Sequence, residues 1–295
     1  MTSTKVPRAV DDLDEYHTQH HVYVPHRTGL PSMGPYVRAL WERRHFAAEL
    51  SRSNIRAAHN DTVFGRLWLV LNPLLLAVVY FLLVDILSGQ RKGADYFAHL
   101  LAGLFAFYFV SGSITSGASS VVGGGKLIMN TAFPRLLLPF SAVRTAFYRF
   151  LPTMIVYAVM HVLAQRPISP VLLLAVPAFG LIVLFALGCA ALVGTVQVYF
   201  RDTSSFLPYF LRIWLYLSPV ILEVSKIHAE FAKHGALLPY LNPLYSLIGS
   251  WSDILTMAKP PSWQMWVASI VWATVAFVGG SLFFMSRERE FAVRL

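Results

Sequence analysis

The stretch that decides the fold begins at Pro170 and reads PVLLLAVPAFGLIVLFALGCAALVGTVQVY as far as Tyr199, then breaks on Phe200-Arg201-Asp202. A second apolar run begins at Phe206. About twenty apolar residues are enough to cross the hydrocarbon core of a bilayer. Two adjacent opposite charges are costly there, so we interpret Arg201 and Asp202 as a short corner between two membrane-crossing helices. The sequence therefore predicts a membrane protein.

The composition points to the same class. The 295 residues are 56% hydrophobic and 13% charged, and the mean hydropathy is +0.56, which is far from the balance of a soluble chain. Cys189 is the single cysteine, so an intrachain disulfide is excluded. The acidic residues between Asp11 and Glu15 are not those of a cleaved secretory signal, and we expect this tail to stay in the cytoplasm.

Length and hydropathy predict an all-α membrane protein with six transmembrane helices. The expected spans are 64–87, 96–121, 136–164, 170–199, 206–222 and 263–284. They form one transmembrane domain over 62–285, between a mobile cytoplasmic tail over 1–35 and a cytoplasmic C-terminal tail over 286–295.

Lysine and arginine near the span ends predict the orientation. One side collects Arg43, Arg44, Arg52, Arg56, Arg66, Lys126, Arg135, Arg201, Arg287, Arg289 and Arg294, and the other has Arg91, Lys92, Arg166, Lys226, Lys233 and Lys259. Both termini are therefore expected in the cytoplasm. We attribute the net charge of +9 to this asymmetry and to attraction for anionic membrane lipids, and we expect no nucleic-acid partner.

Two segments outside the spans have their own patterns. Over 36–61, apolar residues recur at helical spacing opposite charged ones, which predicts an amphipathic helix at the membrane interface; an ordinary solvated helix is the alternative. Over 235–257 the chain is too apolar for a free loop and too broken for a span. We expect a re-entrant helical pair with Asn242-Pro243 at its turn, which either caps the bundle or lines the exit of a pathway.

Polar and aromatic residues inside the spans are the candidate channel or substrate contacts. Arg149 lies near the middle of the third span and should face a helix or an aqueous cavity, where an anionic phosphate would be a suitable partner. The aromatic candidates are Phe105, Tyr108, Phe109, Tyr209, Trp214 and Tyr216. Such rings are commonly packing residues or interface anchors, and the alternative is a conduit in which they stack on sugars.

Signatures of soluble enzymes do not fit. Gly125-Lys126 resembles the end of a phosphate-binding loop, but Ser120 replaces its first glycine and Leu127 its Ser or Thr. The histidines lack companion carboxylates or cysteines at metal spacing, and we expect no metal site. No catalytic residues are expected in this chain.

Five short motifs, in order along 36–295, resemble those of the ABC-2 type permeases, the membrane subunits of polysaccharide exporters. They contain Asn72-Pro73, Pro134-Arg135, Arg201-Asp202, Ser218-Pro219 and Asn242-Pro243. The chain is most similar to the O-antigen-type exporters, in particular to the actinobacterial (mycobacterial) branch that exports lipid-linked galactan. Two features depart from the family pattern, namely the long tail before Tyr36 and the charge at Arg149.

The resemblance implies a homodimer in the bacterial inner membrane that encloses a channel for a polyprenyl-pyrophosphate-linked glycan. It implies two copies of a separate ATPase, which bind ATP and Mg while this chain holds no cofactor. The implied ATPase contacts are Arg38, Trp41, Arg44, Lys126, Met129, Asn130 and Arg135. Small residues, chiefly Gly112 and Ser116 with Gly103, Ser113 and Gly117, could form the seam between the two copies. An ABC-2 efflux permease for drugs or small lipids is the alternative.

Overall fold

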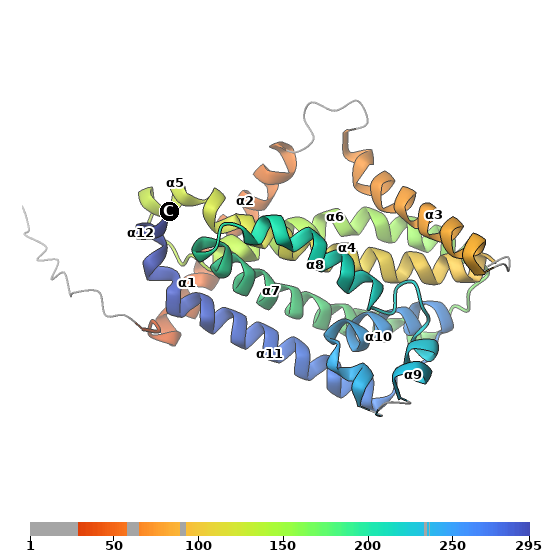
Figure 1. Ribbon diagram of the computed structural model, residues 1–295. Coiled ribbons are helices and arrows are strands. Elements are labelled where there is room, and N and C mark those ends of the chain that lie inside the picture. Colours follow the sequence, from red (N-terminus) through yellow and green to blue (C-terminus); the bar gives the residue numbers. More distant parts are fainter. Residues whose placement is uncertain (1–28, 58–64, 89–92, 233–234, 236) are drawn as a thin grey trace, which may run out of the picture.

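The computed structural model describes residues 29–57, 65–88, 93–232, 235 and 237–295. Most of the expected N-terminal tail lies outside the described residues, as do Phe64, where the first span was expected to begin, and Arg91, Lys92 and Lys233. Within the described part, the chain forms helices joined by short turns and has no strand. The prediction of an all-α protein is confirmed for those residues (Figure 1).

Five helical segments among the described residues are long and apolar enough to cross a membrane. They are α3 (Trp68–Ser88), α4 (Ala94–Gly123), α6 (Leu137–Leu163), α7 (Ala175–Tyr199), which continues the 3-10 turn η3 (Pro170–Leu174), and α11 (Trp263–Arg287). The 3-10 turn η2 (Gly65–Leu67) leads into α3. The ends of these helices lie close to those expected from hydropathy, because length and apolar content are strong signals in a membrane helix.

The segment expected as the fifth span differs. Its helix, α8 (Thr203–Tyr216), has 14 residues, which is about 21 Å at 1.5 Å per residue and short of a hydrocarbon core about 30 Å thick. The helix does not continue to residue 222 because Pro219 disfavours a helical conformation at Ser218. The Val220 N–H instead donates to the Ser218 carbonyl oxygen at 2.7 Å.

The segment after α8 turns back into the bundle through α9 (Val224–Ala232), the 3-10 turn η4 (Leu238–Leu241) and α10 (Pro243–Met257). The expected turn at Asn242-Pro243 is present, but only α10 is a full helix within 235–257. Most residues of α10 are buried, and the indole N–H of Trp251 donates to the Ala102 carbonyl oxygen at 3.0 Å. This segment is therefore part of the packed core.

The expected interfacial helix over 36–61 is divided into α1 (Met33–Glu42) and α2 (Arg44–Ala57). Arg43 leaves the helical conformation and its guanidinium donates to the Ala132 carbonyl oxygen. The next helix docks on α6, where the Thr145 and Ser51 hydroxyl oxygens lie 3.0 Å apart in a buried hydrogen bond. The interruption of the helix at Arg43 thus follows from contacts with the bundle. Such contacts cannot be predicted from the periodicity of the sequence.

The helices have two distinct ends (Figure 1). The first, here called the α5 end, carries α1, α5 (Gly125–Asn130), the 3-10 turn η5 (Glu288–Glu290) and α12 (Phe291–Arg294). Its apolar core includes the buried Phe284 and Phe291, whose rings pack edge to face at 5.1 Å. The opposite end, here called the α9 end, carries α9 and α10.

Glycines allow α7 and α11 to pack closely. A Cβ atom on Gly280 of α11 would collide with the backbone of Gly188 on α7, and one on Gly188 would collide with the backbone of Ala276. Small residues at such crossings let two helix backbones touch. Two small residues expected at a seam between copies make close contacts inside the chain instead. Gly117 packs on Ala190 of α7, and Gly103 packs on Val220 in the turn after α8.

Candidate functional site

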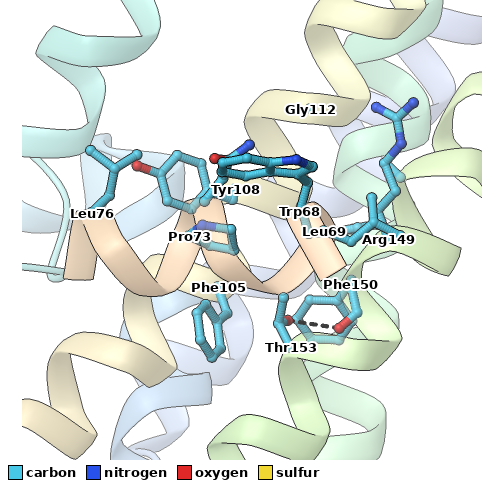
Figure 2. A pocket seen from close by; sticks show the side chains of 13 residues that line it. Trp68, Leu69, Pro73, Leu76, Phe105, Tyr108, Gly112, Arg149, Phe150 and Thr153 are labelled. Carbon is cyan, nitrogen blue, oxygen red and sulfur yellow. Dashed lines mark hydrogen bonds between the residues drawn. The ribbon is translucent and has the colours of Figure 1, made fainter. Parts of the chain in front are cut away.

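A cavity of about 260 Å³ lies between α3, α4 and α6. Its lining residues are Trp68, Leu69, Asn72, Pro73, Leu76, Phe105, Tyr108, Phe109, Gly112, Ala146, Arg149, Phe150 and Thr153 (Figure 2). The structure therefore brings four of the expected channel residues together, namely Phe105, Tyr108, Phe109 and Arg149. The two phenylalanine side chains are buried, whereas Tyr108 is half-buried.

Helical spacing explains the α4 wall of this cavity. Residues 105, 108 or 109, 112 and 116 recur every three or four positions, so they lie along one face of α4. Phe109 packs against Phe150 of α6 at a ring-centroid distance of 5.7 Å, and Phe150 stacks on Phe179 of α7 at 4.4 Å. The inner wall is thus an aromatic cluster fixed by neighbouring helices.

The wall contributed by α3 was not expected from the sequence. Asn72 and Pro73 were recognised only as part of a family motif, and Trp68 was not among the candidate channel residues. Pro73 lies inside α3 and has no N–H to donate, so the Leu69 carbonyl one turn earlier lacks its usual helical donor. Leu69 and Pro73 both line the cavity, so this break in the helical hydrogen bonding lies beside its α3 wall.

Arg149 lies where three hollows meet. It lines the aromatic cavity, a second hollow of about 680 Å³ with Arg52 and Arg56, and a third of about 530 Å³ with Lys126. None of the described residues that line these hollows is acidic. The Nε–H of Arg149 is buried and has no hydrogen-bond partner among the described residues. A half-buried cation with no carboxylate among the described residues around it favours an anionic ligand.

The third hollow is the polar one. It lies between α2, α4, α5 and α6, and its polar lining residues are Asn54, Ser116, Ser119, Ser120, Lys126, Ser141, Thr145 and Arg149. Several of these hydroxyl groups donate to carbonyl oxygens of their own helix, as Ser120 does to Gly117 at 2.7 Å. Their oxygens remain available as acceptors, which suits contact with hydroxylated molecules.

The seam candidates Gly112 and Ser116 lie on the face of α4 that lines the aromatic cavity and the polar hollow. A Cβ atom on Gly112 would meet no heavy atom within 4 Å, and Ser116 lines the polar hollow. The described residues therefore leave open space at Gly112, in contrast to Gly103 and Gly117.

The aromatic candidates of α8 lie outside the cavity. Tyr209 is exposed, and the ring of the largely exposed Tyr216 meets that of Tyr80 on α3 edge to face at 6.4 Å. Trp214 instead links α8 to α10, since its indole N–H donates to the Asn242 side-chain oxygen at 2.9 Å. Trp214 therefore has a packing role in the single chain.

The expected ATPase contacts gather at the α5 end. Lys126, Met129 and Asn130 are exposed on α5. Arg135 is half-buried, and its guanidinium donates to the Glu288 carbonyl oxygen. On α1, Arg38 is exposed and forms an ion pair with Glu42 at 3.2 Å. Trp41 and Arg44 are exposed too, but they border a groove beside α11.

The remaining motif residues shape corners. Arg201 and Asp202 form the expected short corner between α7 and α8, and the Gln197 side chain donates to the Arg201 carbonyl oxygen at 2.9 Å. Leu137 N–H donates to the Pro134 carbonyl oxygen at 3.1 Å where α6 begins. The Ser218 hydroxyl donates to the Trp214 carbonyl oxygen at 2.6 Å. These contacts give the motifs a structural function.

Comparison of the sequence with known proteins identifies the family of this chain. The chain is 30% identical over 260 residues to the O-antigen export system permease protein RfbA of Myxococcus xanthus, an alignment that covers 87% of this chain and 97% of that protein. The chain belongs to the ABC-2 type O-antigen export permeases. Two RfbA proteins of Klebsiella pneumoniae are each 28% identical over 207 residues, which cover 70% of this chain and 78% of theirs. No protein-family model matches the chain.

Membership of this family confirms the resemblance to ABC-2 type permeases that the five motifs indicated. It is consistent with the long apolar helices, which identify the permease as a multi-pass membrane protein.

Proposed function

We propose that this permease is the transmembrane subunit of an ATP-driven exporter that moves a lipid-linked polysaccharide out of the cytoplasm. The lipid carrier is a polyprenyl pyrophosphate, and the glycan is galactan or resembles O-antigen. The relatives named O-antigen export permeases support the polysaccharide class. The galactan assignment rests on the resemblance to the actinobacterial exporters.

The proposed topology has six spans with both termini in the cytoplasm of a bacterial cell. The short helix α8 serves as the fifth span, and α9 with α10 forms a re-entrant unit at the outer surface. The concentration of lysine and arginine at the α5 end supports this orientation. The short α8 is tolerable because the irregular backbone that follows it is held against protein, where Asn242 donates to the Leu217 carbonyl oxygen at 2.8 Å.

One observation carries the proposal for the substrate path. Arg149 joins a polar, cationic hollow beside α5 to a cavity lined by aromatic rings. In the proposed path, the pyrophosphate enters at the polar hollow and pairs with Arg149. The sugars then pass the rings of α4, whose flat faces tolerate many sugar orientations. A hydroxylated polymer needs such a route because each unsatisfied polar group costs several kcal/mol in hydrocarbon.

A complete channel requires two copies of the chain in this proposal. The open α4 face at Gly112 and Ser116 forms the seam, and Tyr209 and Tyr216 of α8 face the conduit or the second copy. Two ATPase subunits supply ATP and Mg and bind at the α5 end. Their contacts are Lys126, Met129 and Asn130 with Arg135 and Arg38, because the first three are exposed on one short helix.

Depletion and complementation test this function. Depleting the permease in its host should cause the lipid-linked glycan to accumulate in the cytoplasm, and wild-type protein should restore export. We expect Arg149→Ala to reduce export at least about tenfold and Arg149→Lys to restore part of it, because Lys keeps the charge but not the bidentate geometry. Normal export by Arg149→Ala would exclude this path.

The depletion experiment also distinguishes polysaccharide export from the alternative function. An efflux permease for drugs or small lipids would leave glycan export intact upon depletion and would change sensitivity to its cargo instead. Co-purification with an ATPase tests the partner independently of the cargo.

A further inference from the structure

A groove of about 530 Å³ runs between α1 and α11 at the α5 end, apart from the hollows at Arg149. Its lining is mostly apolar and consists of Met33, Val37, Leu40, Trp41, Arg44, Ala47, Leu136, Leu137, Phe140, Arg144, Phe277, Val278, Ser281, Leu282 and Met285. The helix α1 forms one side, and the outer faces of α6 and α11 form the other. An open apolar groove of this size on a membrane protein is suited to an acyl chain.

Two cations, Arg44 and Arg144, border this groove. Arg44 lies over the Trp41 ring at 4.9 Å and donates to the Trp41 carbonyl oxygen at 3.0 Å. Arg144 donates to the Tyr148 hydroxyl at 3.0 Å. These partners are uncharged, and the described residues that line the groove include no acidic side chain. The charge of the groove is therefore complementary to an anion.

The arrangement matches the boundary between headgroups and hydrocarbon. Trp41 is 69% exposed beside Arg44, and tryptophan and arginine side chains concentrate at this depth of a bilayer. On the α11 side, Val278 is exposed and Phe277 half-buried, so an apolar surface continues from the cations toward the middle of the span. An isolated phosphate would not fill this surface, and an apolar peptide would leave both cations without a partner.

We propose that the groove between α1 and α11 binds one anionic phospholipid. Its phosphate is held by Arg44 and Arg144, and an acyl chain lies along Phe140, Phe277 and Val278. The lipid fixes α1 to the bundle. This proposal is independent of the transported substrate and assigns Trp41 and Arg44 to lipid, so that Arg38 remains the ATPase contact on α1.

Native mass spectrometry of the purified permease, reconstituted with a defined mixture of phosphatidylglycerol and phosphatidylcholine, tests the site. Wild-type protein should retain one phosphatidylglycerol in preference to phosphatidylcholine. The double variant Arg44→Gln with Arg144→Gln should lose this retained lipid at least about tenfold. The matched control is Arg287→Gln, which removes an exposed cation near the end of α11 that does not line the groove.

Two further variants distinguish loss of the lipid site from loss of folding. Val278→Trp should fill the groove and reduce lipid retention while it preserves both arginines, and replacement of both arginines by Lys should retain the lipid. Melting temperatures of all variants report their folding. Retention of phosphatidylglycerol by the double Gln variant at the wild-type level would overturn the proposal, and so would equal retention of the two lipids by wild-type protein.

Discussion

The hydroxyl of Tyr36 donates a hydrogen bond to the Glu288 carboxylate at 2.6 Å, although 252 positions separate them in the sequence. Burial and then the adjacent carboxylate raise the pKa of Tyr36, so its hydroxyl remains a donor at physiological pH. The Arg135 guanidinium donates to the Glu288 carbonyl oxygen. One residue near the C-terminus thus joins α1 to the segment between α5 and α6, where the ATPase contacts are proposed.

Tyr36→Phe should destabilise the α5 end. The substitution keeps the ring but removes one hydrogen-bond donor from the buried Glu288 carboxylate, which costs about 1–3 kcal/mol. The thermal unfolding midpoint of the detergent-purified permease should fall. Tyr209→Phe is the control, because Tyr209 is exposed on α8. Equal midpoints for the two variants would show that the bond contributes little.

Gly280→Ala should disrupt the contact between α7 and α11. The added methyl group would collide with the backbone of Gly188, and overpacking of this kind costs about 1–3 kcal/mol. Gly279→Ala is a matched control on the same helix, because its Cβ would meet nothing within 4 Å. Fluorescence-detected size-exclusion chromatography after heating should show a loss of folded protein for position 280 alone.

Gly112→Leu should block export without preventing folding. Its Cβ position is open, so the side chain would extend into the cavity or the proposed seam. Export in the complementation assay should fall at least about tenfold if two copies must approach here. Gly180→Leu places the same side chain at another open position, on α7. Export by Gly112→Leu equal to that by Gly180→Leu would argue against the seam.

Asn242→Ala should release α10 from α8. Its side-chain oxygen accepts from the Leu244 N–H at 3.1 Å and the Trp214 indole, and its amide donates to the Leu217 carbonyl oxygen. Loss of a cap and of two further bonds should cost about 2 kcal/mol or more.

Asn242→Asp keeps the acceptor but loses the donor, and should lie between wild type and Asn242→Ala. Limited proteolysis between α8 and α10 would measure the release. A cleavage rate for Asn242→Ala like that of wild type would contradict this role.

The sequence was a good guide to the long helices and a weaker guide to the site. Phe105, Tyr108, Phe109 and Gly112 could be grouped because they share one face of a single helix, and they do line one cavity. Trp68 was missed because its role depends on how α3 lies against α4 and α6. Trp214 was selected as a candidate channel residue because it is aromatic. The structure shows that it instead bonds to Asn242, which is 28 positions away in the sequence.

By itself, the sequence determined the class of the protein, its long apolar helices and its family, since hydropathy over about twenty residues and short motifs are local properties. Tertiary structure decided that 36–61 contains two helices and that Arg149 borders three hollows with no carboxylate among their described lining residues. These features depend on contacts between residues far apart in the chain, and local periodicity does not record them.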